Sequence, residues 1–189
     1  MCAGPGGKAA LLAALAEIDG AHLDAIEISE HRAELIRKTV RDLPVTVHVA
    51  DARESGLEPG FDRILLDAPC SGLGSLRRRP EARWRRSPAD VDELVVLQRE
   101  LLSAAMDLVK PGGVVVYSTC SPHLAETVEV IDTVLATTPG IEQLDARELV
   151  SVPADQLGAG PHVQLWPHIH GTDAMFLTAL RKSGDTPTD

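Results

Sequence analysis

Two cysteines, Cys70 and Cys120, each follow a short apolar run that is typical of a buried strand. The run at residues 64–66 is Ile-Leu-Leu, and the run at residues 114–116 is Val-Val-Val. A single cysteine in such a place is most often an inert core residue. Neighbouring strands of an open α/β sheet, however, end in one crevice, where these sheets bind ligands. The sequence therefore predicts a site built around two thiols.

A glycine-rich segment opens the chain and leads directly into a helical pattern of apolar residues. It consists of Cys2, Ala3, Gly4, Pro5, Gly6, Gly7 and Lys8. Glycines before a helix let backbone N–H groups approach a phosphate, a carboxylate or a nucleoside closely. The segment is not a P-loop, because Ala9 stands where Ser or Thr would follow the lysine. We expect this loop to bind part of a cofactor.

Three acidic residues, Glu27, Asp51 and Asp67, each stand at the end of an apolar stretch. One such carboxylate alone would be interpreted as a solvated loop residue, but three that follow successive predicted strands form a pattern. Glu27 follows Gly7 by 20 positions, the offset at which doubly wound nucleotide-binding folds hold a ribose diol. The pattern favours a ligand that contains a nucleoside.

Four motifs in this chain resemble those of the RsmB/NOP2/Sun family. They are Cys-Ala-Gly-Pro-Gly-Gly-Lys at 2–8, Glu-x-Ser-x-x-Arg at 27–32, Asp-Ala-Pro-Cys-Ser-Gly-x-Gly at 67–74 and Tyr-Ser-Thr-Cys-Ser at 117–121. They stand in family order, and residues 170–176 resemble the family's closing strand segment. The resemblance implies an RNA (cytosine-5-)-methyltransferase that uses S-adenosyl-L-methionine and acts most often on ribosomal RNA. It also implies a Rossmann-like class I methyltransferase fold.

The resemblance implies a role for each residue of the thiol site. Cys120 would be the nucleophile, Cys70 would promote product release, Asp67 would hydrogen-bond the cytosine ring near N3, and Lys8 would lie near both base and cofactor. The chemistry explains why thiols are needed. Cytosine C5 is a poor nucleophile until a thiolate adds at C6, after which C5 can attack the methyl sulfonium. The C5 proton must then leave before the thiol is eliminated.

The same resemblance assigns the cofactor contacts. The loop from Cys2 to Lys8 would surround the methionine end of S-adenosylmethionine, Glu27 would bind the ribose hydroxyls, and Asp51 would lie near the adenine. Asp67 belongs to both the cofactor site and the base site. A cation near Cys120 would favour its thiolate, because a free thiol has a pKa of about 8.5.

A basic segment follows the Cys70 motif and is the candidate RNA-binding surface. It contains Arg77, Arg78, Arg79, Arg83, Trp84, Arg85 and Arg86. The net charge of −10 argues against RNA, because phosphate contacts need cations, but the distribution of charge matters more than its sum. An isolated run of this kind would be a solvated loop. Its position beside Cys70 favours RNA contact, with Trp84 packing or stacking.

Composition limits the remaining possibilities. The 189 residues, 44% of them hydrophobic, predict one catalytic domain over residues 1–182 and a disordered tail at 183–189. Three cysteines without disulfide spacing, and no apolar run of 18 residues, predict a cytoplasmic protein with no membrane segment. His162, His168 and His170 lack the spacing of a zinc site, so no metal is expected.

The hydrophobic periodicity predicts alternating elements and hence an α/β fold with a mostly parallel, doubly wound sheet. Helices are expected at 8–17, 30–42, 88–108 and 124–137, and strands at 22–28, 46–50, 63–67, 114–118, 141–145 and 174–181. The family has a central strand before its glycine loop, whereas this chain begins inside that loop. We therefore expect an N-terminally truncated domain that lacks its first central strand.

Two other functions fit the sequence. The chain could be a catalytically inactive fragment or binding module, which the expected truncation favours. It could also methylate another cytosine substrate, such as transfer RNA or DNA. In DNA methyltransferases a Pro-Cys cysteine is the nucleophile, and Cys70 rather than Cys120 would then form the covalent bond.

Overall fold

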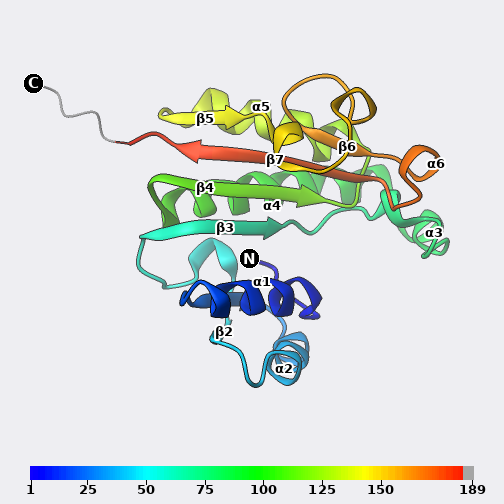
Figure 1. Cartoon of the computed structure of the whole chain (residues 1–189). Helices are drawn as coiled ribbons and strands as arrows, with labels where there is room; N and C mark the ends of the chain where they lie inside the picture. Colours follow the sequence, from blue (N-terminus) through cyan, green and yellow to red (C-terminus); the bar gives the residue numbers. More distant parts are fainter. Residues whose placement is uncertain (185–189) are drawn as a thin grey trace, which may run out of the picture. The chain divides into compact units, whose positions relative to one another are not determined.

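The computed structural model describes residues 1–184, which fall into two compact units divided after Leu57. Figure 1 shows the helices and strands of both units along the chain. Each unit has its own sheet and is described by itself. The single catalytic domain expected over residues 1–182 stays a prediction. From residue 185 onward, the tail expected at 183–189 lies outside the described residues.

The first unit is a parallel two-stranded sheet with two helices. Its elements are α1 (Gly7–Ile18), β1 (Leu23–Glu27), α2 (Glu30–Thr39), β2 (Val45–Val49) and the 3₁₀ turn η1 (Ala52–Glu54). β1 pairs with β2 from Leu23 opposite Val45 to Glu27 opposite Val49. The Ser29 hydroxyl accepts a hydrogen bond from the Arg32 N–H and so caps α2. The core is small and is built from Ala9, Ala25, Ile36 and Val40.

The second unit holds the larger sheet. Its main elements are β3 (Phe61–Asp67), α3 (Ala82–Arg85), α4 (Pro88–Leu108), β4 (Val109–Thr119), α5 (Val128–Thr137), β5 (Ile141–Leu144), β6 (Val163–Leu165), α6 (Pro167–His170) and β7 (Met175–Lys182). Four 3₁₀ turns join them: η2 (Leu73–Ser75), η3 (Leu124–Glu126), η4 (Ala146–Leu149) and η5 (Ala154–Gln156). The strand order is β3-β4-β7-β5, and β6 also pairs with β7.

The larger sheet is mixed rather than uniformly parallel. β3 and β4 are parallel, whereas β7 runs antiparallel to β4, β5 and β6. Because β7 opposes both β4 and β5, the strands β3, β4 and β5 point the same way. The predicted α/β class is therefore confirmed, and β7 is the strand that departs from the parallel arrangement. β1 and β3 each have one hydrogen-bonded neighbour among the described strands.

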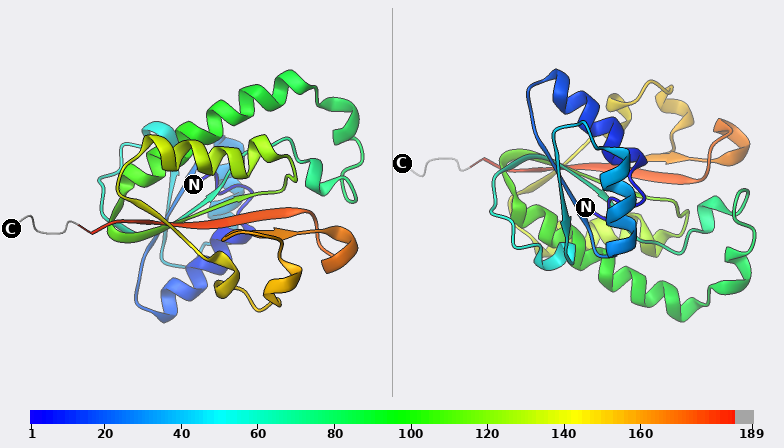
Figure 2. Two further views of the ribbon diagram at one scale, coloured as in Figure 1. Left: turned by 90° about the horizontal axis from the view of Figure 1, so that it is seen from above. Right: turned by 90° about the horizontal axis from the view of Figure 1, so that it is seen from below.

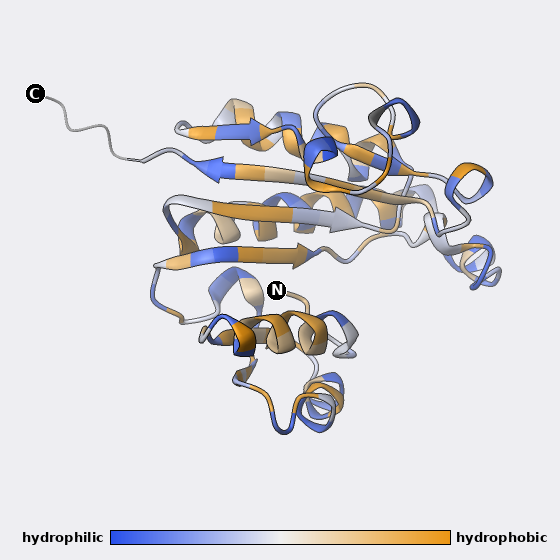
Figure 3. Cartoon of the chain, viewed as in Figure 1, coloured by the Kyte–Doolittle hydropathy of each residue, from blue (hydrophilic) through white to orange (hydrophobic). Residues whose placement is uncertain are grey.

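The larger sheet is covered on both faces. In the views along the sheet, α4 and α5 lie on one face, and the segment with η4 and η5, which leads into β6, lies on the other (Figure 2). The pleat of β4 divides its side chains between these faces. Val115 and Tyr117 are fully buried, while Val114 and Val116 pack on the opposite cluster around Leu157. Hydrophobic stretches along β3 and β4 mark this core (Figure 3).

Helix α4 matches the sequence prediction at both ends because its caps can be read locally. Ser87 and Asp90 form a reciprocal capping box, and Pro88 occupies the first turn. At the other end, the Lys182 ammonium donates to the carbonyls of Met106 and Val109 at 2.8 and 3.1 Å. A cation there also complements the negative end of the helix dipole. No helix in residues 1–184 is both long and apolar enough to cross a membrane.

The predicted helix at 124–137 is two elements. It begins as the turn η3 and becomes α5 at Val128, because Thr127 between them has φ −127° and ψ −101°. The Thr127 hydroxyl donates to the carbonyls of His123 and Leu124, an alternative to the regular helical pattern. The break separates Glu126, in η3, from the regular helix α5.

Other elements also differ from the sequence prediction. β4 begins at Val109, five residues before the apolar run at 114–116. The elements α3, β6 and α6 are too short to show a hydrophobic periodicity, and they were not predicted.

Candidate active site

The two cysteines meet at the carboxyl ends of β3 and β4. The sulfur atoms of Cys70 and Cys120 lie 3.3 Å apart, and both side chains are partly buried. The parallel register explains this contact: Asp67 at the end of β3 lies opposite Ser118, two residues before Cys120. The Ala68 N–H extends the pairing by donating to the Ser118 carbonyl at 2.9 Å. The structure thus brings together the two thiols as the sequence predicts.

The thiol pair is electrostatically asymmetric. A hydrogen bond from the Cys70 thiol lowers the pKa of Cys120 to about 7, although burial and the Asp67 and Asp173 carboxylates act in the opposite direction. The same contact raises the pKa of Cys70 well above its ordinary value, and burial adds to the rise. Cys120 is therefore the sulfur of the pair that ionises first as the pH rises through neutrality, while Cys70 stays protonated beside it. This arrangement suits nucleophilic addition by the Cys120 sulfur, with the protonated Cys70 thiol beside it as a proton donor.

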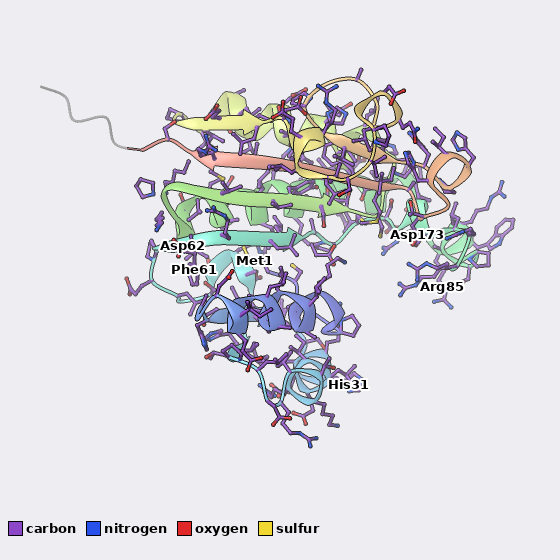
Figure 4. The ribbon with its side chains drawn as sticks, viewed as in Figure 1. Met1, His31, Phe61, Asp62, Arg85 and Asp173 are labelled. Atoms are coloured by element: carbon purple, nitrogen blue, oxygen red, sulfur yellow. The ribbon has the colours of Figure 1, made fainter. Side chains whose placement is uncertain are left out.

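Asp67, the third residue predicted for the base site, lies at the same end of the sheet. The Ser118 hydroxyl donates to its Oδ1 at 3.1 Å, which fixes the carboxylate beside β4. Figure 4 shows Asp173 near this carboxyl end of the strands, whereas Phe61 and Asp62 lie at the opposite end of β3. The catalytic candidates of this unit therefore lie at the carboxyl ends of its parallel strands, which is where open α/β sheets bind their ligands.

A buried carboxylate that the sequence analysis did not single out connects the two cysteine loops. Glu126 is 0% exposed. Its Oε1 accepts the Ser71 N–H at 2.7 Å, and its Oε2 accepts the hydroxyls of Ser71 at 2.5 Å and Ser121 at 2.6 Å. Ser71 follows Cys70, and Ser121 follows Cys120. The sequence offers little local signal for it, because Glu126 lies six residues after Cys120 in a stretch of mixed polar and apolar residues.

Gly74 makes a second connection between the same loops. Its N–H donates to the Cys120 carbonyl, and its own carbonyl accepts the Ala174 N–H, each at 2.9 Å. A Cβ at this position would lie 2.1 Å from the Ala174 oxygen and 2.7 Å from the Cys120 oxygen. Glycine is thus required here for close backbone approach. The segment after Cys70 is held between the Cys120 loop and the start of β7.

The arginines of the basic segment that follows Cys70 differ in their contacts. Arg78 pairs with Asp173 through its Nε, 3.0 and 2.9 Å from the two carboxylate oxygens, and through its Nη2. Arg77 lies 4.0 Å from the same carboxylate, which is 8% exposed and whose pKa Arg78 lowers. All six arginines of the segment are exposed, Arg78 included despite its ion pair, and Trp84 is 84% exposed with the Arg83 guanidinium 5.8 Å from its ring centre. Arg85 lies on α3, at the outer side of the unit (Figure 4).

In the first unit, the glycine loop and Glu27 are in direct contact. Glu27 ends β1, is 2% exposed, and accepts the N–H groups of Gly4 at 2.9 Å and Ser29 at 3.1 Å. Arg32 lies 3.7 Å from its carboxylate and also donates to the Gly4 carbonyl. A Cβ at Gly4 would stand 2.6 Å from the Glu27 Oε2, so the loop fits only as glycine. The structure thus forms a small cradle of backbone and carboxylate.

The remaining predicted cofactor residues lie in the same unit. Asp51 follows β2, and its carboxylate is held by the Arg53 N–H at 2.9 Å and by the Arg53 guanidinium, which lowers the pKa of the aspartate. Lys8 is exposed in the first turn of α1. Both residues therefore lie in the unit that holds Cys2 and Glu27, while Cys70 and Cys120 belong to the other unit.

Strand order and strand-end residues together define the Rossmann-like fold of class I S-adenosylmethionine-dependent methyltransferases. A crystal structure described as NSun6 from Pyrococcus horikoshii with SFG matches the chain with a TM-score of 0.83 and 30% sequence identity. The match covers 98% of this chain and 47% of that one. The predicted fold class is confirmed.

The chain belongs to the 16S rRNA methyltransferase RsmB/F family, whose model matches residues 1–181. A putative methyltransferase of Mycobacterium tuberculosis (strain H37Rv) is 60% identical over 182 residues, covering 96% of this chain and 40% of the relative. The probable ribosomal RNA small subunit methyltransferase B of Bacillus subtilis (strain 168) is 35% identical over 190 residues, covering 97% and 42%. The chain thus spans about two fifths of these relatives' length. The predicted family resemblance is confirmed.

Proposed function

We propose that this chain carries the catalytic site of an enzyme that methylates C5 of cytosine in ribosomal RNA with S-adenosylmethionine. The observation that carries the proposal is the contact of 3.3 Å between Cys70 and Cys120, with the thiolate on Cys120. Membership of the RsmB/F family supports an RNA substrate. The matched chain in the structure with SFG, a cofactor analogue, supports the cofactor.

The thiolate of Cys120 performs the first step. Its electron pair forms a bond to C6 of the cytosine, and the displaced electron density passes to C5. S-adenosylmethionine, when bound, would supply the methyl group that C5 takes up and would leave as S-adenosylhomocysteine. Cys70 releases its own proton to solvent and its sulfur then takes up the C5 proton, the C5–C6 double bond re-forms, and the Cys120 sulfur departs as a thiolate.

Cys70 assists the release. While Cys120 is a free thiolate, their hydrogen bond keeps Cys70 protonated. Once Cys120 is bonded to C6, it no longer carries the negative charge that Cys70 stabilises, so the proton of Cys70 becomes easier to remove. The second thiol is thus made available at the stage when the C5 proton has to leave. Asp67, fixed by Ser118, accepts a hydrogen bond from the base on the same side.

The first unit fits the cofactor through its cradle. Glu27 has two carboxylate oxygens, each with one backbone N–H donor from the chain, which leaves acceptor capacity for the hydroxyls of a ribose. The Cys2 to Lys8 loop would surround the methionine end, and Asp51 would lie near the adenine. We assign RNA backbone contact to the exposed basic residues Arg77, Arg79, Arg83, Arg85 and Arg86, with Trp84 beside them.

The proposal is tested by trapping the covalent adduct. Purified protein is incubated with 16S ribosomal RNA and S-adenosylmethionine and analysed on denaturing gels. The Cys120→Ala variant should form no adduct and transfer no methyl group. The Cys70→Ala variant should accumulate adduct, because release is slowed. An adduct that survives Cys120→Ala but disappears with Cys70→Ala would make Cys70 the nucleophile, as in DNA cytosine methyltransferases. No methyl transfer and no adduct in the unchanged protein would refute the proposal.

A further inference from the structure

A buried hydrogen-bond network surrounds both cysteines on the side of the sheet covered by α4. It contains one carboxylate, Glu126, and one amide, Gln98, both fully buried. The Gln98 amide nitrogen donates to the Pro69 carbonyl at 2.9 Å and to the Glu126 Oε1 at 3.2 Å. Both of these partners are acceptors, which fixes the orientation of the amide. Pro69 precedes Cys70 in the chain, so the network reaches the residue on each side of that cysteine.

We propose that Glu126 is a positioning residue that joins the loop of Cys70 to the loop of Cys120 and thereby holds the two sulfur atoms in contact. The geometry supports this role directly. One carboxylate oxygen accepts from hydroxyls on both loops, at 2.5 Å from Ser71 and 2.6 Å from Ser121. The two hydroxyl oxygens are 3.4 Å apart, nearly the separation of the two sulfurs.

The Cys70 loop is held by a distant part of the chain, whereas the Cys120 loop contains Glu126 itself. Ser71 and Glu126 are 55 residues apart in the chain and Gln98 lies 28 residues from Glu126, but Ser121 is only five residues from it. The position of Glu126 is itself fixed, because the Tyr117 hydroxyl donates to its backbone carbonyl at 2.9 Å. Tyr117 is fully buried in β4, three residues before Cys120. The carboxylate is therefore tied to the strand that carries the proposed nucleophile.

A carboxylate is better suited to this position than an amide. The Oε2 of Glu126 accepts two hydroxyl hydrogen bonds at distances typical of charge-assisted O–H···O⁻ contacts. An amide nitrogen at the same place donates instead of accepting, and N–H···O contacts are longer, at about 2.9–3.0 Å. Glu126→Gln keeps the side-chain volume, but in either amide orientation a donor replaces one of the two acceptors. An amide nitrogen at the Oε1 place faces the Ser71 N–H and the Gln98 amide, both donors, and at the Oε2 place it lengthens both serine contacts, so the two loops should move apart.

Loss of the network should be measurable at Cys120 without any substrate. If the sulfur atoms separate, Cys120 loses the hydrogen bond from Cys70, and its pKa should rise from about 7 toward the free-thiol value of about 8.5. Removing the negative charge of Glu126 would by itself lower the pKa of a nearby thiol. The expected direction therefore separates a change of geometry from a change of charge. The other charged groups near Cys120, Asp67, Asp173 and Arg78, are unchanged in the variant.

The experiment is a pH profile of alkylation. The chain is treated with iodoacetamide between pH 5 and 10, and labelling of each cysteine is followed by peptide mass spectrometry. Glu126→Gln should move the midpoint for Cys120 upward. The matched control is Glu129→Gln, which removes the same charge from an exposed position on α5 and should leave the midpoint near 7. An unchanged or lowered midpoint in Glu126→Gln would overturn the proposal.

A double-mutant cycle distinguishes positioning from general loosening. In a Cys70→Ala background the hydrogen-bond donor is gone, so Cys120 should already have a raised pKa, and Glu126→Gln should cause no further rise, only the small lowering that the loss of its charge brings. An equal further rise in that background would show that Glu126 acts on Cys120 by another route and would also overturn the proposal. Ser121→Ala keeps the carboxylate but removes one of its donors, and it should raise the midpoint in the same direction if Glu126→Gln does not fold.

This inference rests on the proposed function in one respect: holding the two thiols in contact matters for catalysis only if Cys120 is the nucleophile. The alkylation profile contains neither RNA nor cofactor. A failed adduct experiment with a normal Glu126→Gln effect would refute the methyltransferase mechanism and keep the positioning role. A normal adduct with no Glu126→Gln effect on the alkylation midpoint would refute the positioning role and keep the methyltransferase mechanism.

Discussion

Replacing Gly74 by alanine tests whether the Cys70 segment is held by close backbone contact. The added Cβ would lie 2.1 Å from the Ala174 carbonyl oxygen and 2.7 Å from the Cys120 carbonyl oxygen. Both obstacles are backbone atoms, so a side-chain rotation cannot relieve the clash. To reach an ordinary van der Waals distance of about 3.4 Å, the separation must grow by about 1.3 Å at Ala174 and about 0.7 Å at Cys120. The movement also lengthens the two hydrogen bonds that Gly74 makes with Cys120 and Ala174.

The cost can be worked from these contacts. Overpacking costs about 1–3 kcal/mol, and approaches of 2.1 and 2.7 Å to two backbone oxygens place Gly74→Ala at the upper end of that range. The two weakened backbone hydrogen bonds each add up to about 1 kcal/mol. Gly74→Ala should therefore lower the free energy of unfolding by about 3–5 kcal/mol, a large share of the roughly 5–15 kcal/mol of a typical domain. At a urea slope of about 2 kcal/mol/M, the unfolding midpoint should fall by about 1.5–2.5 M.

The assay is urea unfolding followed by circular dichroism, with Gly72→Ala as the control. Gly72 has φ +75°, and its nearest neighbour to an added Cβ is the Ser75 hydroxyl at 3.7 Å, an ordinary contact. Alanine there should cost only the strain of a positive φ, about 1–2 kcal/mol. Equal effects at the two glycines would refute the reasoning, because the collision at Gly74 would then contribute nothing beyond backbone conformation.

Two further predictions concern the ligands. Glu27→Ala should weaken S-adenosylmethionine binding about tenfold to a hundredfold in a calorimetric titration, because hydrogen bonds to a charged acceptor are worth about 1.5–3 kcal/mol; unchanged affinity in the folded variant would remove Glu27 from the site. Changing the exposed arginines to glutamine should reduce the salt dependence of RNA binding by about 0.7 in log–log slope for each single-strand phosphate that the variant no longer binds. Parallel salt plots for parent and variant would mean that the segment binds no phosphate. The residues to change are Arg77, Arg79, Arg83, Arg85 and Arg86.

The contact of the two thiols could be predicted because it depends on a rule of topology. Cys70 and Cys120 each stand three or fewer residues beyond a strand end, and parallel neighbours end together. The Glu27 cradle was predictable for the same reason, since its spacing from the glycine loop is set within one β-α-β unit. Helix α4 was predictable at its start because Ser87 and Pro88 act locally, and at its end because Pro-Gly-Gly follows at 111–113.

The parts that could not be predicted depend on partners far away in the chain. Glu126 acts through Ser71, 55 residues earlier, and Arg78 is paired with Asp173, 95 residues later. Neither the local hydrophobic periodicity nor the spacing of motifs in the sequence indicates such long-range contacts. Arg78 illustrates the consequence: its place in a basic run suggests an RNA contact like that of its neighbours, but the fold gives it a buried carboxylate partner.

The antiparallel strand β7 has a consequence for how the cysteine site is made. β7 is the last strand of the described chain, yet it lies between β4 and β5 and pairs with residues 114–119 of β4. During synthesis from the N-terminus, β3 and β4 can meet first, but one edge of β4 stays open until residues 175–182 have emerged. The hydrogen bond from the Ala174 N–H to the Gly74 carbonyl can likewise form only after this part of the chain has emerged. A nascent chain therefore carries its reactive cysteines on an unfinished sheet, and the fold completes their surroundings only as the final strand is inserted.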